Sequence, residues 1–129
     1  MSDNFTITDE TKGGSAFAEL PFLQMKEEIL GKDYELSLVF VGPEKSQTLN
    51  KQYRNKNEPT DILSFPLDKA RGEIFIDIET AKKESAKFER DLPNFIQFLV
   101  IHGLVHLEGF EHGSKMESEE KKYRVKFNV

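Results

Sequence analysis

The chain has 129 residues, no cysteine and a formal net charge of −5 at pH 7. This length predicts one domain, spanning residues 1–129, with a core that needs no disulfides. Without cysteine, nitrogen and oxygen are the ligands left for a metal ion. The acidic balance argues against indiscriminate nucleic-acid binding but still allows a local basic groove. No apolar run reaches the roughly 20 residues of a membrane span, and the start is unlike a signal peptide, so we expect a cytoplasmic protein.

The first part of the chain alternates predicted strands and helices. Residues 5–7 form a short apolar run that predicts a strand, and residues 16–30 predict an amphipathic helix with Pro21 in its first turn. The apolar side chains near one side of this helix are Phe17, Leu20, Leu23 and Ile29. Residues 34–41 alternate as in a strand, and residues 44–54 follow a proline and predict a second helix.

The second part of the chain predicts a hairpin followed by helices. Two short apolar runs, residues 60–66 and 72–78, are separated by turn-forming residues and predict paired strands. Residues 79–90 predict a charged helix that is mostly solvated. The following helix begins near Pro93 and is apolar nearly all round from residue 95 to 107, which indicates burial. This order predicts an α+β fold with a small mixed sheet of about four strands and a central buried helix.

All three histidines of the chain lie within eleven residues, in "HGLVHLEGFEH". His102 and His106 are four residues apart, so they lie on the same helix face. Gly109 is suited to end the helix, and His112 follows where a reversing chain can return to the first two. A single histidine on an apolar helix is more often a hydrogen-bonded core residue. Three in this spacing favour a metal site, two of its ligands being carried by the buried helix.

The predicted ligand set indicates a catalytic rather than a structural metal. Three neutral nitrogens without a fourth nearby protein ligand leave one coordination position open. Zinc is the preferred ion, one per chain, although nickel, copper or cobalt also accept such ligands. Such an ion lowers the pKa of bound water toward about 7.

The spacing also matches the metallopeptidase pattern H-E-x-x-H-x-x-G-x-x-H. Gly103 stands where that pattern has its glutamate, and glycine cannot act as a base. Glu108 and Glu111 do not occupy the required helix position. A metallopeptidase therefore stays open only if a carboxylate from elsewhere, such as Glu73 or Asp77, reaches the metal.

Four stretches together resemble the YbeY-type endoribonuclease family, also called ribosomal RNA maturation factors. They are "LNKQYRNKNEPTDILSFP" (residues 49–66), "GEIFID", "HGLVHLEGFEH" and the "MESEE" that follows. The family carries L-N-x-x-Y-R, P-T-D-V-L-S-F-P, G-D-I, H-G-x-L-H-L-x-G-Y-D-H and a trailing M-x-x-x-E. The resemblance covers roughly residues 36–120. Among the small departures, Glu111 replaces the family aspartate and is one methylene longer, which shifts any hydrogen bond it makes to a ligand.

The resemblance implies an α+β metal-dependent hydrolase with zinc held by His102, His106 and His112. It implies cleavage of single-stranded RNA in maturation of small-subunit ribosomal RNA and in ribosome quality control. The expected partners are rRNA precursors and the ribosomal small subunit or its assembly factors, without DNA or membranes. The family's functional arginine corresponds to Arg54, and we name Arg54 and His102 as catalytic. A planar guanidinium binds phosphate oxygens in two-pronged fashion, although an arginine at a helix end commonly serves only the helix dipole.

The residues around Arg54 have both structural and functional interpretations. Thr60 and Asp61 precede a strand, where such residues usually cap backbone amides. Ser64 and Phe65 can line a substrate groove, with Phe65 stacking on a base, although such a phenylalanine is more often core. The nearby basic residues that can contact phosphates or simply aid solubility are Lys51, Lys56, Lys69 and Arg71. A non-catalytic ribosome-assembly factor, with zinc only fixing the fold, is the other open class.

Overall fold

The computed structural model describes residues 4–11 and 17–129. Strands predominate up to residue 77, and three helices follow. The strands are β1 (Phe5–Asp9), β2 (Glu35–Val41), β3 (Ile62–Asp68) and β4 (Arg71–Asp77). The helices of the described residues are α1 (Phe22–Leu30), α2 (Pro43–Arg54), α3 (Ile78–Lys87), α4 (Leu92–Glu108) and α5 (Ser114–Phe127).

The four strands form one mixed sheet in the order β1-β2-β4-β3. β1, β2 and β4 run parallel, whereas β3 runs antiparallel to β4. Parallel neighbours need crossover connections, and α1 supplies the one between β1 and β2. The predicted α+β fold with a mixed sheet of about four strands is confirmed, and so is the predicted hairpin between β3 and β4.

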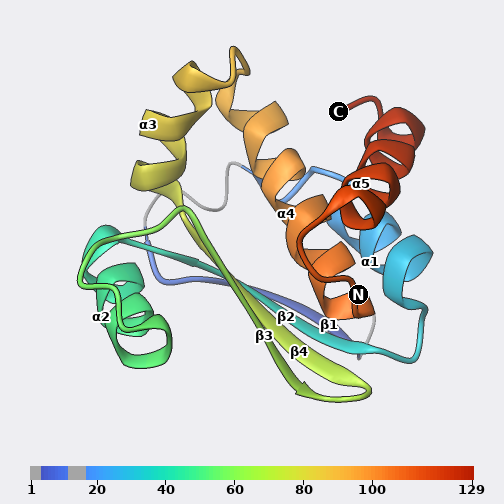
Figure 1. The fold of residues 1–129 in the computed structure, drawn as a ribbon, viewed down its shortest axis with the longest axis horizontal. Coiled ribbons are helices and arrows are strands. Elements are labelled where there is room, and N and C mark those ends of the chain that lie inside the picture. The colour runs from blue at the N-terminus through green and yellow to red at the C-terminus, as the bar shows by residue number, and fades with distance from the viewer. Residues whose placement is uncertain (1–3, 12–16) are drawn as a thin grey trace.

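Helices cover both faces of this sheet (Figure 1). α4 contacts β3 and β4 over the main core, which contains Leu38, Ile74 and Ile76. Val39 and Leu63 are also buried but lie outside that core. Because side chains alternate along a strand, these two face the other way, toward the side where α2 contacts β3 and β4.

α4 is the central helix of the structure, because α1, α3 and α5 each contact it in addition to the sheet (Figure 1). The Asp91 side chain caps its start by accepting a hydrogen bond from the Asn94 amide at 2.8 Å. Gly109 ends it with φ +115°, a left-handed conformation that favours glycine. The buried residues of α4 are Phe95, Ile96, Leu99, Val100, Ile101, Gly103, Leu104 and Val105. The predicted buried helix and its glycine end are confirmed.

Helix α1 is shorter than predicted, because it begins at Phe22 rather than at residue 16. Residue 16 lies outside the described residues, and residues 17–20 form turns. Pro21 stands at the N-cap, and a proline ring disfavours the helical conformation of the residue before it. The predicted apolar side still contacts the core through Phe17, Leu20, Leu23 and Ile29.

Helix α5 was not predicted from the sequence. Its buried residues are Met116, Glu120 and Tyr123, which are spaced four and three apart as on one helix face. Because a glutamate occupies the middle of this stripe, the apolar pattern typical of a packed helix is interrupted. Among residues 4–11 and 17–129, no helix is long and apolar enough to cross a membrane.

Candidate active site

A cavity of about 520 Å³ lies between the end of α2, strand β3 and helix α4. Arg54 lines it on one side, and His102, His106 and His112 line it on the other. The remaining lining residues are Thr60, Asp61, Ile62, Leu63, Ser64 and Phe65. The structure therefore brings together the four residues that the sequence singled out, from segments far apart along the chain.

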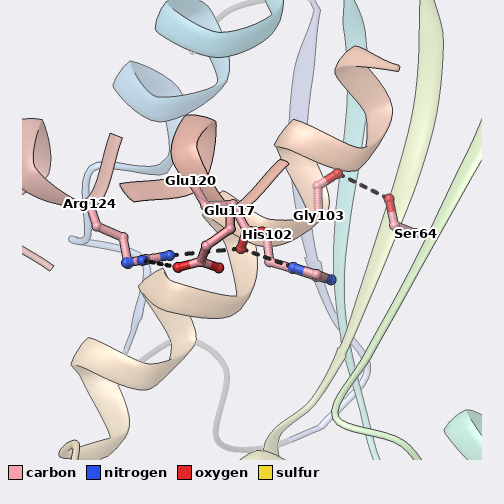
Figure 2. Close-up of polar contacts among 6 residues, drawn as sticks. All are labelled: Ser64, His102, Gly103, Glu117, Glu120 and Arg124. Atoms are coloured by element: carbon pink, nitrogen blue, oxygen red, sulfur yellow. Dashed lines mark hydrogen bonds and ion pairs between the residues drawn. The ribbon is translucent and has the colours of Figure 1, made fainter. Parts of the chain in front are cut away.

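His102 is held in place by α5 (Figure 2). Its Nδ1 lies 2.9 Å from Oε1 of Glu120, a side chain that is 7% exposed. A carboxylate accepts hydrogen bonds, so the ring donates through Nδ1–H and keeps the Nε2 lone pair available. Arg124 approaches Glu120 Oε1 to 3.9 Å and Glu117 Oε1 to 2.9 Å. These contacts fix the orientation and tautomer of the His102 ring.

The other two histidines lie beside His102. The ring centroids of His102 and His112 are 5.5 Å apart. Burial, and then the proximity of His102 and His112, lowers the pKa of His106, which favours its neutral form. Its Nδ1 is buried and has no hydrogen-bond partner among the described residues. Within that part of the chain, no group of three or more His, Cys, Asp or Glu side chains is arranged as a metal site, so metal binding by these histidines stays a prediction.

Gly103 lies where α4 packs closely against the sheet. A Cβ atom at this position would lie 3.0 Å from Cδ1 of both Ile62 and Ile74. Ser64 also donates a hydrogen bond from Oγ to the Gly103 carbonyl at 3.2 Å, joining β3 to α4 (Figure 2). The absence of the peptidase glutamate therefore has a physical reason, because a side chain at this position would have to displace the Ile62 and Ile74 side chains.

The two carboxylates named as candidate bases for a metallopeptidase also lie elsewhere. Asp77 is buried and accepts hydrogen bonds from Ser46 Oγ and Thr80 Oγ1, both at 2.7 Å. Glu73 lines a separate hollow beside β1 and β2. Neither residue is in the lining of the histidine cavity.

Arg54 is the exposed last residue of α2. Asn55 follows in the left-handed conformation, with φ 57°, and turns the chain away from the helix axis. No hydrogen bond or ion pair joins Arg54 to another residue in the described ranges, so its guanidinium is free to meet a ligand in the cavity. None of the four other basic candidates, Lys51, Lys56, Lys69 and Arg71, lines this cavity.

A sequence model of the family described as Endoribonuclease YbeY matches residues 5–127. The chain belongs to the YbeY family. It is 34% identical over 116 residues to Endoribonuclease YbeY of Acholeplasma laidlawii, covering 87% of this chain and 81% of the relative. Endoribonuclease YbeY of Colwellia psychrerythraea is 42% identical over 96 residues, covering 69% of this chain and 62% of that relative. The solution structure of TM1509 from Thermotoga maritima matches with TM-score 0.66 and 29% identity, covering 92% of this chain and 85% of that one.

Glu120 is the site residue that sequence reasoning missed. It corresponds to the final position of the M-x-x-x-E pattern that the chain shares with the YbeY family, beginning at Met116. The M-x-x-x-E pattern was visible in the sequence, and the signal lay in its spacing, since a core methionine and a glutamate four positions later lie on the same helix face. That spacing predicts a buried carboxylate, which needs a partner such as a histidine.

Asp61 has a structural contact and a place in the cavity. It directly precedes strand β3, and it lines the cavity beside the histidines. Burial, followed by the proximity of Glu84, raises its pKa, while the backbone amides of Ile62 and Asp61 and the proximity of His102 act in the opposite direction. Ser64 and Phe65 line the cavity as the sequence suggested.

Proposed function

We propose that this member of the YbeY family is a metal-dependent endoribonuclease that cleaves single-stranded RNA. Its relatives in Acholeplasma laidlawii and Colwellia psychrerythraea are named Endoribonuclease YbeY. The observation that carries the proposal is the shared cavity, in which Arg54 lies with three histidines. The substrates we propose are precursors of small-subunit rRNA in the cytoplasm, with the small subunit or its assembly factors as partners.

The histidines fit a divalent metal ion, with zinc as the first choice and nickel or another divalent ion as alternatives. His106 has a buried nitrogen without a hydrogen-bond partner among the described residues, and a metal would supply the missing partner. Glu120 behind His102 is the usual arrangement of a carboxylate behind a metal-ligating imidazole. A bound ion would supply Lewis acidity toward a phosphate oxygen.

In this proposal Arg54 binds the phosphate at which the RNA is cleaved. Cleavage of a phosphodiester builds negative charge on its non-bridging oxygens, and a guanidinium binds two such oxygens at once. Because Arg54 is exposed and borders the cavity, it can reach a phosphate that lies against the histidines. Glu120 meanwhile keeps the Nδ1 proton of His102 in place, so that Nε2 presents a lone pair throughout the reaction.

The experiment that tests the function compares three substrates with purified protein. We expect cleavage of a single-stranded RNA, at least tenfold slower cleavage of the same sequence in a duplex, and no hydrolysis of an unfolded protein such as casein. The proteins compared are wild type and Arg54→Ala. Equal rates for the two RNAs, or an Arg54→Ala protein that cleaves as fast as wild type, would contradict the proposal.

A further inference from the structure

A second cavity, of about 340 Å³, adjoins the candidate active site. The two cavities share Asp61, Ile62, His102 and His112 as walls. The second cavity is therefore directly adjacent to the space where Arg54 and the histidines lie. Its other walls come from the end of α3, the first turns of α4 and the start of α5.

One wall of the second cavity is a group of phenylalanines. Phe88 is 51% exposed, and its ring centroid lies 5.3 Å from Phe95 and 5.6 Å from Phe98. The Arg90 guanidinium lies over the Phe98 ring at 4.5 Å, which leaves Phe88 as the ring of this group with a solvent-facing surface. Phe98 precedes His102 by four residues, about 6 Å along the axis of α4. The exposed ring of Phe88 therefore packs on a residue one helical turn before His102.

The polar part of the same wall is acidic. Asp61, Glu117 and Glu120 line the second cavity, and its lining contains no lysine or arginine. Carboxylates repel a phosphate but accept hydrogen bonds from the amino groups of bases, as in contacts with cytosine N4 or adenine N6. The Glu117 side chain is 66% exposed; its Oε1 accepts a hydrogen bond from Arg124 at 2.9 Å, and its Oε2, which has no partner among the described residues, is the oxygen open to an incoming base.

The opposite end of the paired cavities carries an aromatic surface as well. Tyr53, next to Arg54, is 61% exposed and packs at 5.0 Å on Phe65, which lines the first cavity. Among the described residues, the exposed large hydrophobic side chains are Tyr53, Leu67, Phe88 and Val125. Two of the four thus flank the histidines from opposite sides, an arrangement that suits unpaired bases stacking before and after a bound phosphate.

We propose that the second cavity binds one unpaired nucleobase of the substrate RNA, stacked on Phe88, and that it favours bases that carry an amino group. This inference rests on the proposed function and assigns a specificity to it. An aromatic ring can stack on any base, so the choice between bases falls to the carboxylates. Cytosine and uracil separate the two effects, because they share a ring size and differ at the exocyclic amino group.

The test uses labelled 2′-O-methyl oligomers of eight cytidines or eight uridines, with fluorescence anisotropy as the binding measurement. A gel after each titration verifies that the oligomer is intact. We expect Phe88→Ala to weaken binding of the cytidine oligomer by about tenfold, the usual effect of losing one stacked base. Leu67→Ala, a variant of a side chain that is 53% exposed and lies outside both cavities, is the matched control and should stay within twofold of wild type.

A second variant, Glu117→Gln, tests the base preference. We expect wild type to bind the cytidine oligomer several-fold more tightly than the uridine oligomer, and Glu117→Gln to bring the two affinities together. Wild-type binding that is unchanged in Phe88→Ala would overturn the proposal while the endoribonuclease function stands, and would leave the Phe88 surface to a protein partner. A wild type that neither binds nor cleaves RNA would instead overturn the proposed function itself.

Discussion

The two walls of the active-site cavity are built differently. The wall formed by α4 and α5 is held in place by hydrogen bonds. His102 contacts the buried Glu120, and the Gly103 carbonyl accepts a hydrogen bond from Ser64. The wall formed by the end of α2 carries Arg54, which is exposed and has no ion pair within the described part of the chain. One wall is fixed before any ligand arrives, and the other can adjust to it.

This difference matches two functions, metal binding by the histidines and binding of the phosphate by Arg54. Ligands of a metal ion need a fixed geometry, which packing and buried hydrogen bonds provide. A cation that binds a developing charge needs access to the substrate and contributes little to the fold. We therefore expect substitutions in the fixed wall to change stability or metal affinity, and substitutions at Arg54 to change the reaction rate alone.

The largest effect is expected at Gly103, where α4 packs closely against β3 and β4. Gly103→Glu, which restores the glutamate of the peptidase pattern, should lower the free energy of unfolding by about 3 kcal/mol or more, because a charged side chain is forced against Ile62 and Ile74. Chemical denaturation measures the loss, and a casein assay should show no peptidase activity. A stable Gly103→Glu protein would show that this wall is less rigid than its contacts indicate.

The next effect concerns the ligands. His112→Ala should lower zinc affinity by more than roughly a hundredfold, since even partners behind the ligands contribute ten- to a hundredfold. Competition with a chromophoric chelator measures the affinity, with each of His102→Ala and His106→Ala tested in parallel. An unchanged zinc affinity in His112→Ala would remove this residue from the ligand set.

Arg54→Ala tests the adjustable wall. The single-turnover rate of RNA cleavage should fall by about a hundredfold, the usual loss when one donor to a transition state is removed, while zinc content and melting temperature stay at wild-type values. Arg54→Lys should recover only part of the rate, because an ammonium keeps the charge but loses the two-pronged geometry. A fall in melting temperature would place Arg54 with the structural residues instead.

Glu120 lies between these extremes, because it contacts a predicted ligand without being one. Glu120→Ala should weaken zinc binding by about tenfold or more, and Glu120→Gln, which can still accept from the His102 Nδ1–H, should weaken it less. The control is Glu119→Ala, a neighbouring carboxylate on α5 that pairs with Lys122. Equal zinc affinities for Glu120→Ala and wild type would contradict the positioning role.

The smallest effect is a pH dependence of the metal-free protein. The pKa of His106 is lowered on folding, so its contribution to stability is present above the unfolded pKa of about 6.5 and is lost as the pH falls below it. Unfolding free energies at pH 7.5 and 5.5 should differ less in His106→Gln than in wild type. Identical pH dependence of the two proteins would contradict the lowered pKa.

Much of this architecture could be predicted from the sequence, and the failures have local causes. Period-two alternation identified β2, and the run of apolar residues after Pro93 identified α4, because both signals come from burial along a single element. The start of α1 was wrong by several residues, since Pro21 ends the preceding turn instead of sitting inside a helix. α5 was missed because its buried stripe contains Glu120, whose partner His102 is distant in the sequence.

The site was predictable where spacing within one helix sufficed. His102 and His106 follow from an interval of four residues, and their approach to Arg54 came from the family resemblance. The acidic second cavity was not predictable, because α3, α4 and α5 meet there only in the folded chain. The basic residues near Arg54 in sequence were no better guide, since Lys51 lines a separate hollow on α2.

The most direct test of the account is a metal titration of RNA cleavage. Protein stripped of metal by chelation is reloaded with zinc in steps, and the cleavage rate of one single-stranded RNA is measured at each step. We predict no cleavage by the stripped protein and a linear rise that levels off at one zinc ion per chain. A stripped protein that cleaves at the wild-type rate, with its zinc content verified as absent, would contradict the assignment of the histidine cavity as a metal-dependent active site.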